Sequence, residues 1–155
     1  QGRKRWNCNN LSRWPIALMT NIEFNPALVG INVVTTYLPS HSQPEEDRYT
    51  FAYTITISNA SDVPVQLLSR HWVITDADSD VEEVRGDGLV GEQPVIGPGD
   101  SFSYSSGASL ATPVGCMEGT YFMVVREPME VNPRDLPTFE VPIPAFTLHT
   151  PTALN

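Results

Sequence analysis

Residues Arg85 to Tyr121 read RGDGLVGEQPVIGPGDSFSYSSGASLATPVGCMEGTY. Short apolar or aromatic runs alternate here with turns that are rich in glycine and proline. That alternation is typical of an antiparallel β protein, in which such turns join neighbouring strands. The stretch also contains a G-x-G-x-x-G spacing at Gly86, Gly88 and Gly91, the only motif in the chain that suggests a binding chemistry.

The same pattern continues on the N-terminal side of this stretch. Thr50 to Ser58 alternates strictly between large apolar residues and small ones, as a half-buried strand does. Ile31 to Leu38 and Val65 to Thr75 are rich in strand-forming residues and predict two further strands. The 14 prolines and 10 glycines leave no window for a long helix. We therefore predict an all-β fold, a two-sheet antiparallel β-sandwich, over about Asn21 to Leu148.

The charge of the chain is acidic and unevenly distributed. Nine basic residues oppose 18 acidic ones, for a net charge of −9. From Met19 onward five arginines oppose all 18 acids, which gives −13. Such a surface repels phosphate backbones and anionic lipids, so we predict no nucleic-acid partner and expect a basic or neutral protein instead. No apolar run approaches the roughly 20 residues of a membrane span, so we predict no membrane insertion.

The segment Gln1 to Leu18 differs in composition from the rest of the chain. It holds four of the nine basic residues and two of the three tryptophans. Its apolar run, Ile16 to Met19, is too short for the core of a signal peptide. We therefore predict a disordered N-terminal extension or a foreign upstream segment over residues 1–18, and one domain over residues 19–155.

The glycine motif has two interpretations. In a dinucleotide-binding fold such glycines follow a strand and open a helix, whose N-terminus holds the pyrophosphate. Here Pro94 and Pro98 follow closely, and a proline inside a helix removes a donor and clashes with the preceding turn. We therefore favour turn glycines that need a positive φ. The alternative is a backbone nest at Gly86, Gly88 and Gly91 that binds a nucleotide or pyrophosphate without a helix.

A further candidate is Arg70, which stands beside His71 and Trp72 in the middle of a predicted strand. In a strand, Arg70 and Trp72 face one way and His71 faces the other. We expect Trp72 to anchor the core and Arg70 to pair with a neighbouring acid. The functional alternative is that Arg70 binds a carboxylate or phosphate of a ligand.

No other set of residues suggests a cofactor, a metal or a catalytic group. Asp76 to Asp80 resembles the start of a calcium loop, but Val81 stands at its glycine position and Asp87 at its glutamate position. We favour a solvated hairpin turn there, with weak divalent binding as the alternative. Cys8 and Cys116 make neither a disulfide framework nor a zinc site, which indicates a reducing cytoplasm. We predict that the protein is not an enzyme and uses no cofactor.

Several stretches together resemble the ApaG family, also called CorD in bacteria. They are Leu68–Trp72, Val84–Pro94, Pro98–Gly107, Thr112–Tyr121 and Ile143–Phe146. The resemblance covers nearly all of Asn21 to Leu148 as a single ApaG domain of the bacterial type. It implies an immunoglobulin-like or fibronectin-type sandwich without an established catalytic residue. It also implies protein binding, as in related domains of F-box proteins, and in bacteria a link to cobalt resistance and magnesium efflux.

We therefore expect a non-catalytic module that binds a protein partner, with the oligomeric state left open. Recognition is expected in the segments Pro39 to Asp47 and Gly107 to Gly119, which we predict to be loops, or along an exposed sheet edge. The alternative is a protein that binds a small ligand at the Gly86 to Gly91 turn or a divalent metal at the acidic hairpin.

Overall fold

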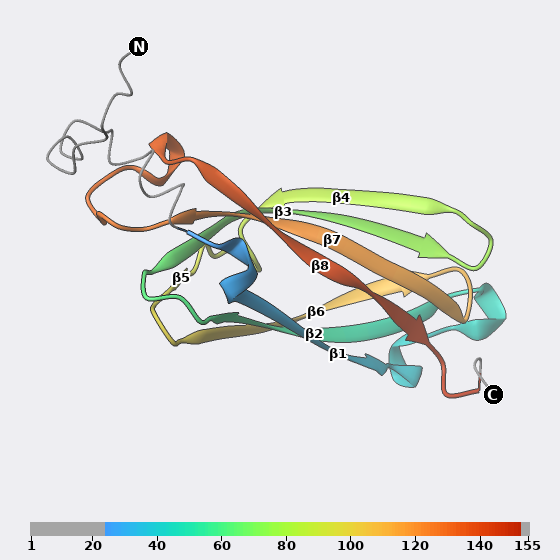
Figure 1. Ribbon diagram of the computed structural model, residues 1–155. Helices are drawn as coiled ribbons and strands as arrows, with labels where there is room; N and C mark the ends of the chain where they lie inside the picture. The colour runs from blue at the N-terminus through green and yellow to red at the C-terminus, as the bar shows by residue number, and fades with distance from the viewer. Residues whose placement is uncertain (1–23, 153–155) are drawn as a thin grey trace, which may run out of the picture.

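A computed structural model describes residues 24–152, which form an antiparallel β-sandwich (Figure 1). Its strands are β1 (Val29–Tyr37), β2 (Tyr49–Asn59), β3 (Val65–Asp76), β4 (Val81–Asp87), β5 (Val95–Ile96), β6 (Ser101–Leu110), β7 (Val114–Val125) and β8 (Thr138–His149). Four 3-10 turns, each with a proline in its first turn, accompany them: η2 (Pro26–Leu28), η3 (Pro39–His41), η4 (Pro44–Glu46) and η5 (Pro133–Asp135). The predicted fold class is confirmed. The segment 1–18 and its boundary lie outside the described residues.

Two sheets form the layers of the sandwich. One has the order β1-β2-β6, and the other has the order β4-β3-β7-β8, with β5 paired to the first part of β3. On one side of the sandwich β1 lies against β8. On the other side β4 and β6 are the margins of their sheets, and Figure 1 shows them in different layers. No helix of the described residues is long and apolar enough to cross a membrane.

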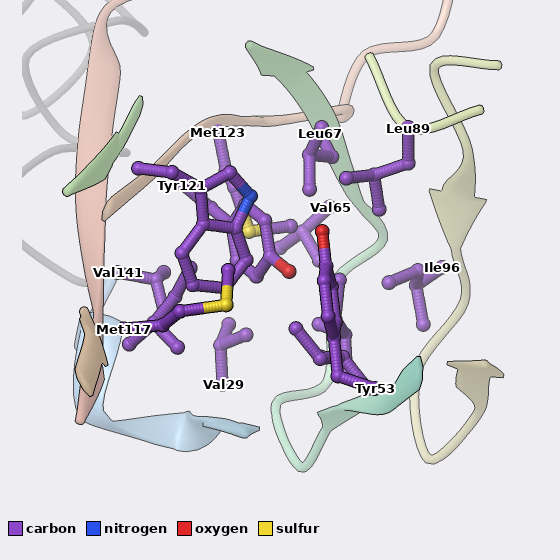
Figure 2. Packing of buried hydrophobic residues seen from close by; sticks show 14 of the residues in the cluster. Val29, Tyr53, Val65, Leu67, Leu89, Ile96, Met117, Tyr121, Met123 and Val141 are labelled. Carbon is purple, nitrogen blue, oxygen red and sulfur yellow. The ribbon is translucent and has the colours of Figure 1, made fainter. Parts of the chain in front are cut away.

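The alternation of β2 builds one wall of the core. Its large odd-numbered side chains are buried: Phe51, Tyr53, Ile55 and Ile57. The even-numbered threonines Thr54 and Thr56 face outward and hydrogen-bond to serine hydroxyls of β6. Figure 2 shows side chains of both sheets meeting in the core, among them Tyr53 of β2 and Tyr121 of β7.

A β-bulge in β3 determines which of its side chains face the core. Leu67 pairs with Met123 and Ser69 with Phe122, so Leu68 is the extra residue opposite β7. An inserted residue exchanges the faces of all residues that follow it. Leu67 is fully buried before the bulge, and Trp72 is 3% exposed after it. The bulge therefore places Trp72 on the core side, which confirms it as a core residue, and Arg70 lies on the same side of the strand because it is two residues away, as predicted.

The expected loop from Gly107 to Gly119 is wrong. β6 continues to Leu110 and β7 begins at Val114, so only three residues connect the two strands. Gly115 and Gly119 stand where backbones come close: a Cβ on Gly119 would lie 2.4 Å from the carbonyl oxygen of His71. A glycine in a strand can thus mark close packing rather than a turn.

Candidate functional site

A groove of about 460 Å³ opens on the side of the sandwich where β4 and β6 form the margins. Aromatic walls come from Tyr53 of β2, Trp72 of β3 and Tyr104 of β6. Arg70 and Glu82 add one cation and one anion to the same lining. The groove thus combines apolar surface with two opposite charges on the open side of the fold, which is the usual composition of a binding site.

Arg70 is held by the backbone of the glycine motif. Its Nη1 donates hydrogen bonds to the carbonyl oxygens of Asp87, at 3.0 Å, and Gly88, at 2.7 Å. The guanidinium lies against Gly86, where an added Cβ would stand 2.9 Å from Nη1. No carboxylate of residues 24–152 forms an ion pair with Arg70, so the expected pairing with a neighbouring acid is wrong.

The glycines of the motif have different structural reasons. Gly88 and Gly91 have φ values of 63° and 82°, which a side chain disfavours. A Cβ on Gly88 would also lie 2.2 Å from the carbonyl oxygen of Glu92. The prediction of a positive φ is confirmed at these two positions and wrong at Gly86. Gly86 instead leaves space for the guanidinium of Arg70.

The motif directs carbonyl groups, rather than N–H groups, toward the charged side chain beside it. The N–H groups of Gly88 and Leu89 donate to other carbonyls of the chain. The carbonyl groups of Asp87 and Gly88 accept from Arg70. After the turn the chain enters β5 instead of a helix. This polarity suits a cation, whereas an anion-binding nest presents its N–H groups.

The turn is anchored in the core at one residue and exposed at the next. Leu89 is 1% exposed and belongs to the buried cluster shown in Figure 2. Gly88 also donates to the carbonyl oxygen of Leu68, the bulged residue of β3, at 2.8 Å. Val90 at the tip is 70% exposed and has a φ of 48°, which is an unusual conformation for a β-branched residue. The hydrogen bond from Gly88 to Leu68 therefore links the glycine turn to the bulge of β3.

Two tyrosines link the sheets beside the groove. The hydroxyl of Tyr104 in β6 lies 2.5 Å from that of Tyr121 in β7. Burial raises the pKa of Tyr104 to about 12. Burial and the neighbouring Tyr104 also raise the pKa of Tyr121, while the positive charge of Arg70 opposes both increases. Both phenols are therefore neutral at physiological pH and serve as hydrogen-bonding groups rather than as bases.

The other candidates from the sequence lie outside the groove. Asp76 accepts hydrogen bonds from the N–H groups of Asp78 and Asp80 in an exposed hairpin, which confirms the predicted turn. His71 is on the opposite face of β3, where its Nε2 lies 2.9 Å from Oε1 of Glu83. Between residues 24 and 152, no three His, Cys, Asp or Glu side chains are grouped to hold a metal ion.

The structure brings three of the four predicted site residues together. Arg70 contacts Gly86 and Gly88, whereas Gly91 lies near the tip of the turn, where an added Cβ would meet nothing within 4 Å. Tyr104 and Glu82 line the groove with Arg70, although no local motif marks either of them in the sequence. The alternation within their strands indicates a face for each, but only strand pairing and the packing of the two sheets bring these faces into the same groove as Arg70.

Comparison with known proteins identifies relatives of this whole architecture. The model of the ApaG domain matches residues 39–125. Protein ApaG of Thiobacillus denitrificans is 54% identical over 127 residues, which cover 82% of this chain and 94% of the relative. Protein ApaG of Pseudomonas aeruginosa is 50% identical over 127 residues, with the same coverage of 82% and 94%.

Solved structures give the same result. The crystal structure of the ApaA protein from Bordetella pertussis matches with a TM-score of 0.73 and 43% sequence identity. The match covers 81% of this chain and 95% of that one. The family match spans more than half of the sequence, and relatives this similar are matched over nearly their full length. The chain therefore belongs to the ApaG family.

Proposed function

We propose that this protein is a non-catalytic module that binds an extended segment of a partner protein along β4. The observation that carries the proposal is the free edge of this strand. Among residues 24–152, β4 pairs with β3 alone. About half of its backbone N–H and C=O groups therefore point away from the sheet. Such an edge accepts a further strand through main-chain hydrogen bonds.

The margins on the opposite side of the sandwich are less suited to strand addition. β8 contains Pro142 and Pro144, which have no N–H to donate, and it lies against β1. β4 and β6 contain no proline and flank one groove. A segment that pairs with either of these strands therefore lies over the groove.

The charges around β4 favour a partner with basic residues. The hairpin that ends in β4 exposes several acids: Asp78, Asp80, Glu82, Glu83 and Asp87. Arg85 is the one basic residue between positions 76 and 87. Complementary charge speeds association and rejects phosphate-rich partners. In this proposal the protein acts in the cytoplasm, and any role in cobalt resistance or magnesium efflux runs through the bound partner.

Site-specific photo-crosslinking in cells tests the proposal. A benzophenone side chain replaces Glu83, whose side chain is exposed on β4. The control position is Asn32, exposed on β1. We expect position 83 to capture a discrete partner and position 32 to capture none. Equal capture at both positions contradicts binding along β4.

Proline substitution then separates strand addition from other contacts. Successive N–H groups of a strand alternate between its two neighbours. One of the variants Glu82→Pro and Glu83→Pro therefore removes only a donor of the free edge and keeps the ladder to β3. We expect this folded variant to lose the crosslinked partner. If it captures the partner as the wild-type protein does, main-chain pairing along β4 is not the mode of binding.

The small-ligand alternative predicts a different result. A nucleotide or pyrophosphate at the glycine turn would shift the amide resonances of Gly86, Gly88 and Gly91 in a saturable titration. The carbonyl groups that the motif directs to Arg70 weigh against an anion there. A saturable shift that is lost in folded alanine variants would favour the ligand over the protein partner.

A further inference from the structure

We propose that the groove selects the segment bound along β4 by three of its side chains: an acidic residue against Arg70, an apolar residue against Trp72 and a basic residue against Glu82. This inference rests on the proposed function, because it names the side chains of the segment that β4 would bind. Its ligand is thus an extended peptide with an acid, an apolar residue and a base at every second position.

The acidic position follows from the unused donors of Arg70. Both carbonyl groups that contact Arg70 accept from Nη1. Nε and Nη2 have no hydrogen-bond partner among the described residues. These two atoms form one edge of the guanidinium, and that edge matches the two oxygens of a carboxylate. A cation fixed in a groove without a carboxylate partner favours an anionic group of the ligand.

Gly86 keeps this edge in place. The guanidinium is so close to Gly86 that a Cβ there would stand 3.0 Å from both Cζ and Nη2. Gly86 lies directly opposite Arg70 in the register of β3 and β4. A strand added beside Gly86 therefore has its own inward side chain next to the guanidinium. The carboxylate of a glutamate at that position reaches the free edge of Arg70.

The basic position follows from Glu82. Glu82 lines the groove, is exposed, and has no ion-pair partner among residues 24–152. It precedes Gly86 by four residues on the same face of β4, a separation of about 13 Å along a strand. A lysine or arginine of the added strand opposite Glu82 forms a cross-strand pair of opposite charges, which stabilises neighbouring strands.

The apolar position lies between the two charges. Val84 is midway between Glu82 and Gly86, faces the groove, and lies opposite Trp72 in the strand register. Tyr53 and Tyr104 line the same groove. An aliphatic or aromatic residue of the added strand opposite Val84 removes apolar surface from water.

The direction of the segment sets the order of its residues. Side chains on one face of a strand recur at every second residue. An antiparallel segment meets Gly86 first and Glu82 last, so it carries the order acid-x-apolar-x-base. A parallel segment carries the reverse order.

Fluorescence anisotropy with the full chain and synthetic peptides tests this selection. The probes are labelled Ser-Thr-Glu-Thr-Leu-Thr-Lys-Thr-Ser and its reversed-order counterpart, Ser-Thr-Lys-Thr-Leu-Thr-Glu-Thr-Ser. The comparison peptide, Ser-Thr-Glu-Lys-Leu-Thr-Thr-Thr-Ser, has the same composition but places the acid and the base on opposite faces. We expect one of the two probes to bind about fivefold more tightly than the comparison peptide. Equal binding of all three peptides overturns the inference, as does the absence of binding.

Substitutions in the protein assign each contact. Gly86→Ala displaces the guanidinium of Arg70. We expect this variant to bind the preferred peptide about fivefold less tightly. The same substitution should not affect a peptide that carries glutamine in place of its acid. Glu82→Gln should weaken the binding of the peptide that carries lysine. It should not affect the binding of a peptide that carries glutamine in place of that lysine. The matched control is Arg85→Gln on the opposite face of β4, which should leave binding unchanged.

The outcomes distinguish this inference from the proposed function. Peptides that bind without regard to charge, but lose binding in the folded proline variant of β4, support strand addition and overturn the selection. The selection is also overturned if peptide affinity depends on the peptide charges but does not change in Gly86→Ala and Glu82→Gln. The charged residues of the peptide would then bind outside the groove. Arg70→Gln is a second test of the acidic position, since it keeps a polar side chain and removes the cation.

Discussion

Gly86 and Gly88 are separated by one residue, yet each is a glycine for a different physical reason. Gly88 has a positive φ, and a Cβ there meets the backbone oxygen of Glu92 at 2.2 Å. Gly86 has no positive φ, and the three atoms nearest to a Cβ there all belong to the end of the flexible Arg70 side chain. A backbone contact cannot move away at low cost, whereas a guanidinium can.

This difference predicts unequal stability of two alanine variants. We expect Gly88→Ala to lower the free energy of unfolding by about 2 kcal/mol or more, from the left-handed φ and the clash with Glu92. Gly86→Ala should change it by less than about 1 kcal/mol. Urea denaturation followed by tryptophan fluorescence measures both. Gly30→Ala is the control, because a Cβ there meets nothing within 4 Å. An equal decrease in the free energy of unfolding for both variants would mean that the Arg70 side chain cannot move away from an added Cβ at position 86.

The paired phenols predict a loss of stability in alkali. An unfolded tyrosine ionises at a pKa of about 10, whereas the pKa of Tyr104 in the fold is raised to about 12. The unfolded chain therefore releases its proton first, so this contribution is complete below pH 10 and declines as the pH rises to 12. We expect the free energy of unfolding to decrease across that interval in urea titrations at fixed pH.

The variant Tyr104→Phe distinguishes the ionisation of Tyr104 from other causes of the stability loss at alkaline pH. At neutral pH the variant should be less stable by about 1–3 kcal/mol, because the buried hydroxyl of Tyr121 loses its partner. Its stability should then decline less steeply above pH 10 than that of the wild-type protein. Identical slopes in the two proteins would show that Tyr104 does not cause the alkaline loss.

The turn from Leu89 to Glu92 carries conformational strain at Val90. This residue has a φ of 48° and is 70% exposed, so little packing compensates for the conformation. Asparagine tolerates this region better than a β-branched residue does. We expect Val90→Asn to raise the free energy of unfolding by about 0.5–1 kcal/mol in thermal or urea denaturation.

A matched control is available on a neighbouring strand. Val81 is 61% exposed in β4 and lacks a positive φ. Val81→Asn should therefore be neutral or destabilising, because asparagine is disfavoured in strands. If both substitutions have the same effect, the gain at position 90 comes from exchanging an exposed apolar side chain and not from relief of the turn.

The strands differ in how far their sequences specify them. The alternation in β2 was predicted residue by residue, because its pleat is regular and one face is buried. The bulge at Leu68 was not, because an inserted residue shows only in the pairing with β7. The glycines of the segment 107–119 predict a loop, although Gly115 and Gly119 allow close backbone approach in a strand. Local sequence does not distinguish these two uses of glycine.

The candidate site depends on the assembly of both sheets. Arg70, Gly86 and Gly88 were selected from the sequence because an arginine and a glycine motif are recognisable locally. Tyr104 comes from the other sheet and Glu82 from the far end of β4. Their place in the same groove as Arg70 follows from strand pairing and from the packing of the two sheets. That Arg70 forms no ion pair within residues 24–152 likewise depends on where the carboxylates of the folded sheets lie.

The layout of the sandwich predicts a gradient of amide hydrogen exchange. Within residues 24–152, β3 and β7 have neighbours on both sides, whereas β4 and β6 have one. In the free protein we expect the slowest exchange in the fully buried part of β7, around Met123 and Val124. About half of the β4 amides, those at its free edge, should exchange quickly, because protection requires a hydrogen-bond partner.

A bound segment should change this gradient at one place. If the preferred peptide pairs with β4, the quickly exchanging amides between Val81 and Asp87 slow markedly, while those of β1 and β8 do not change. Exchange measured by nuclear magnetic resonance, with and without saturating peptide, resolves the alternate residues. The free-edge amides should slow because they acquire partners, and the alternate amides already paired with β3 should change little. Slowing confined to β6 would place the segment on the opposite margin of the groove and contradict pairing with β4.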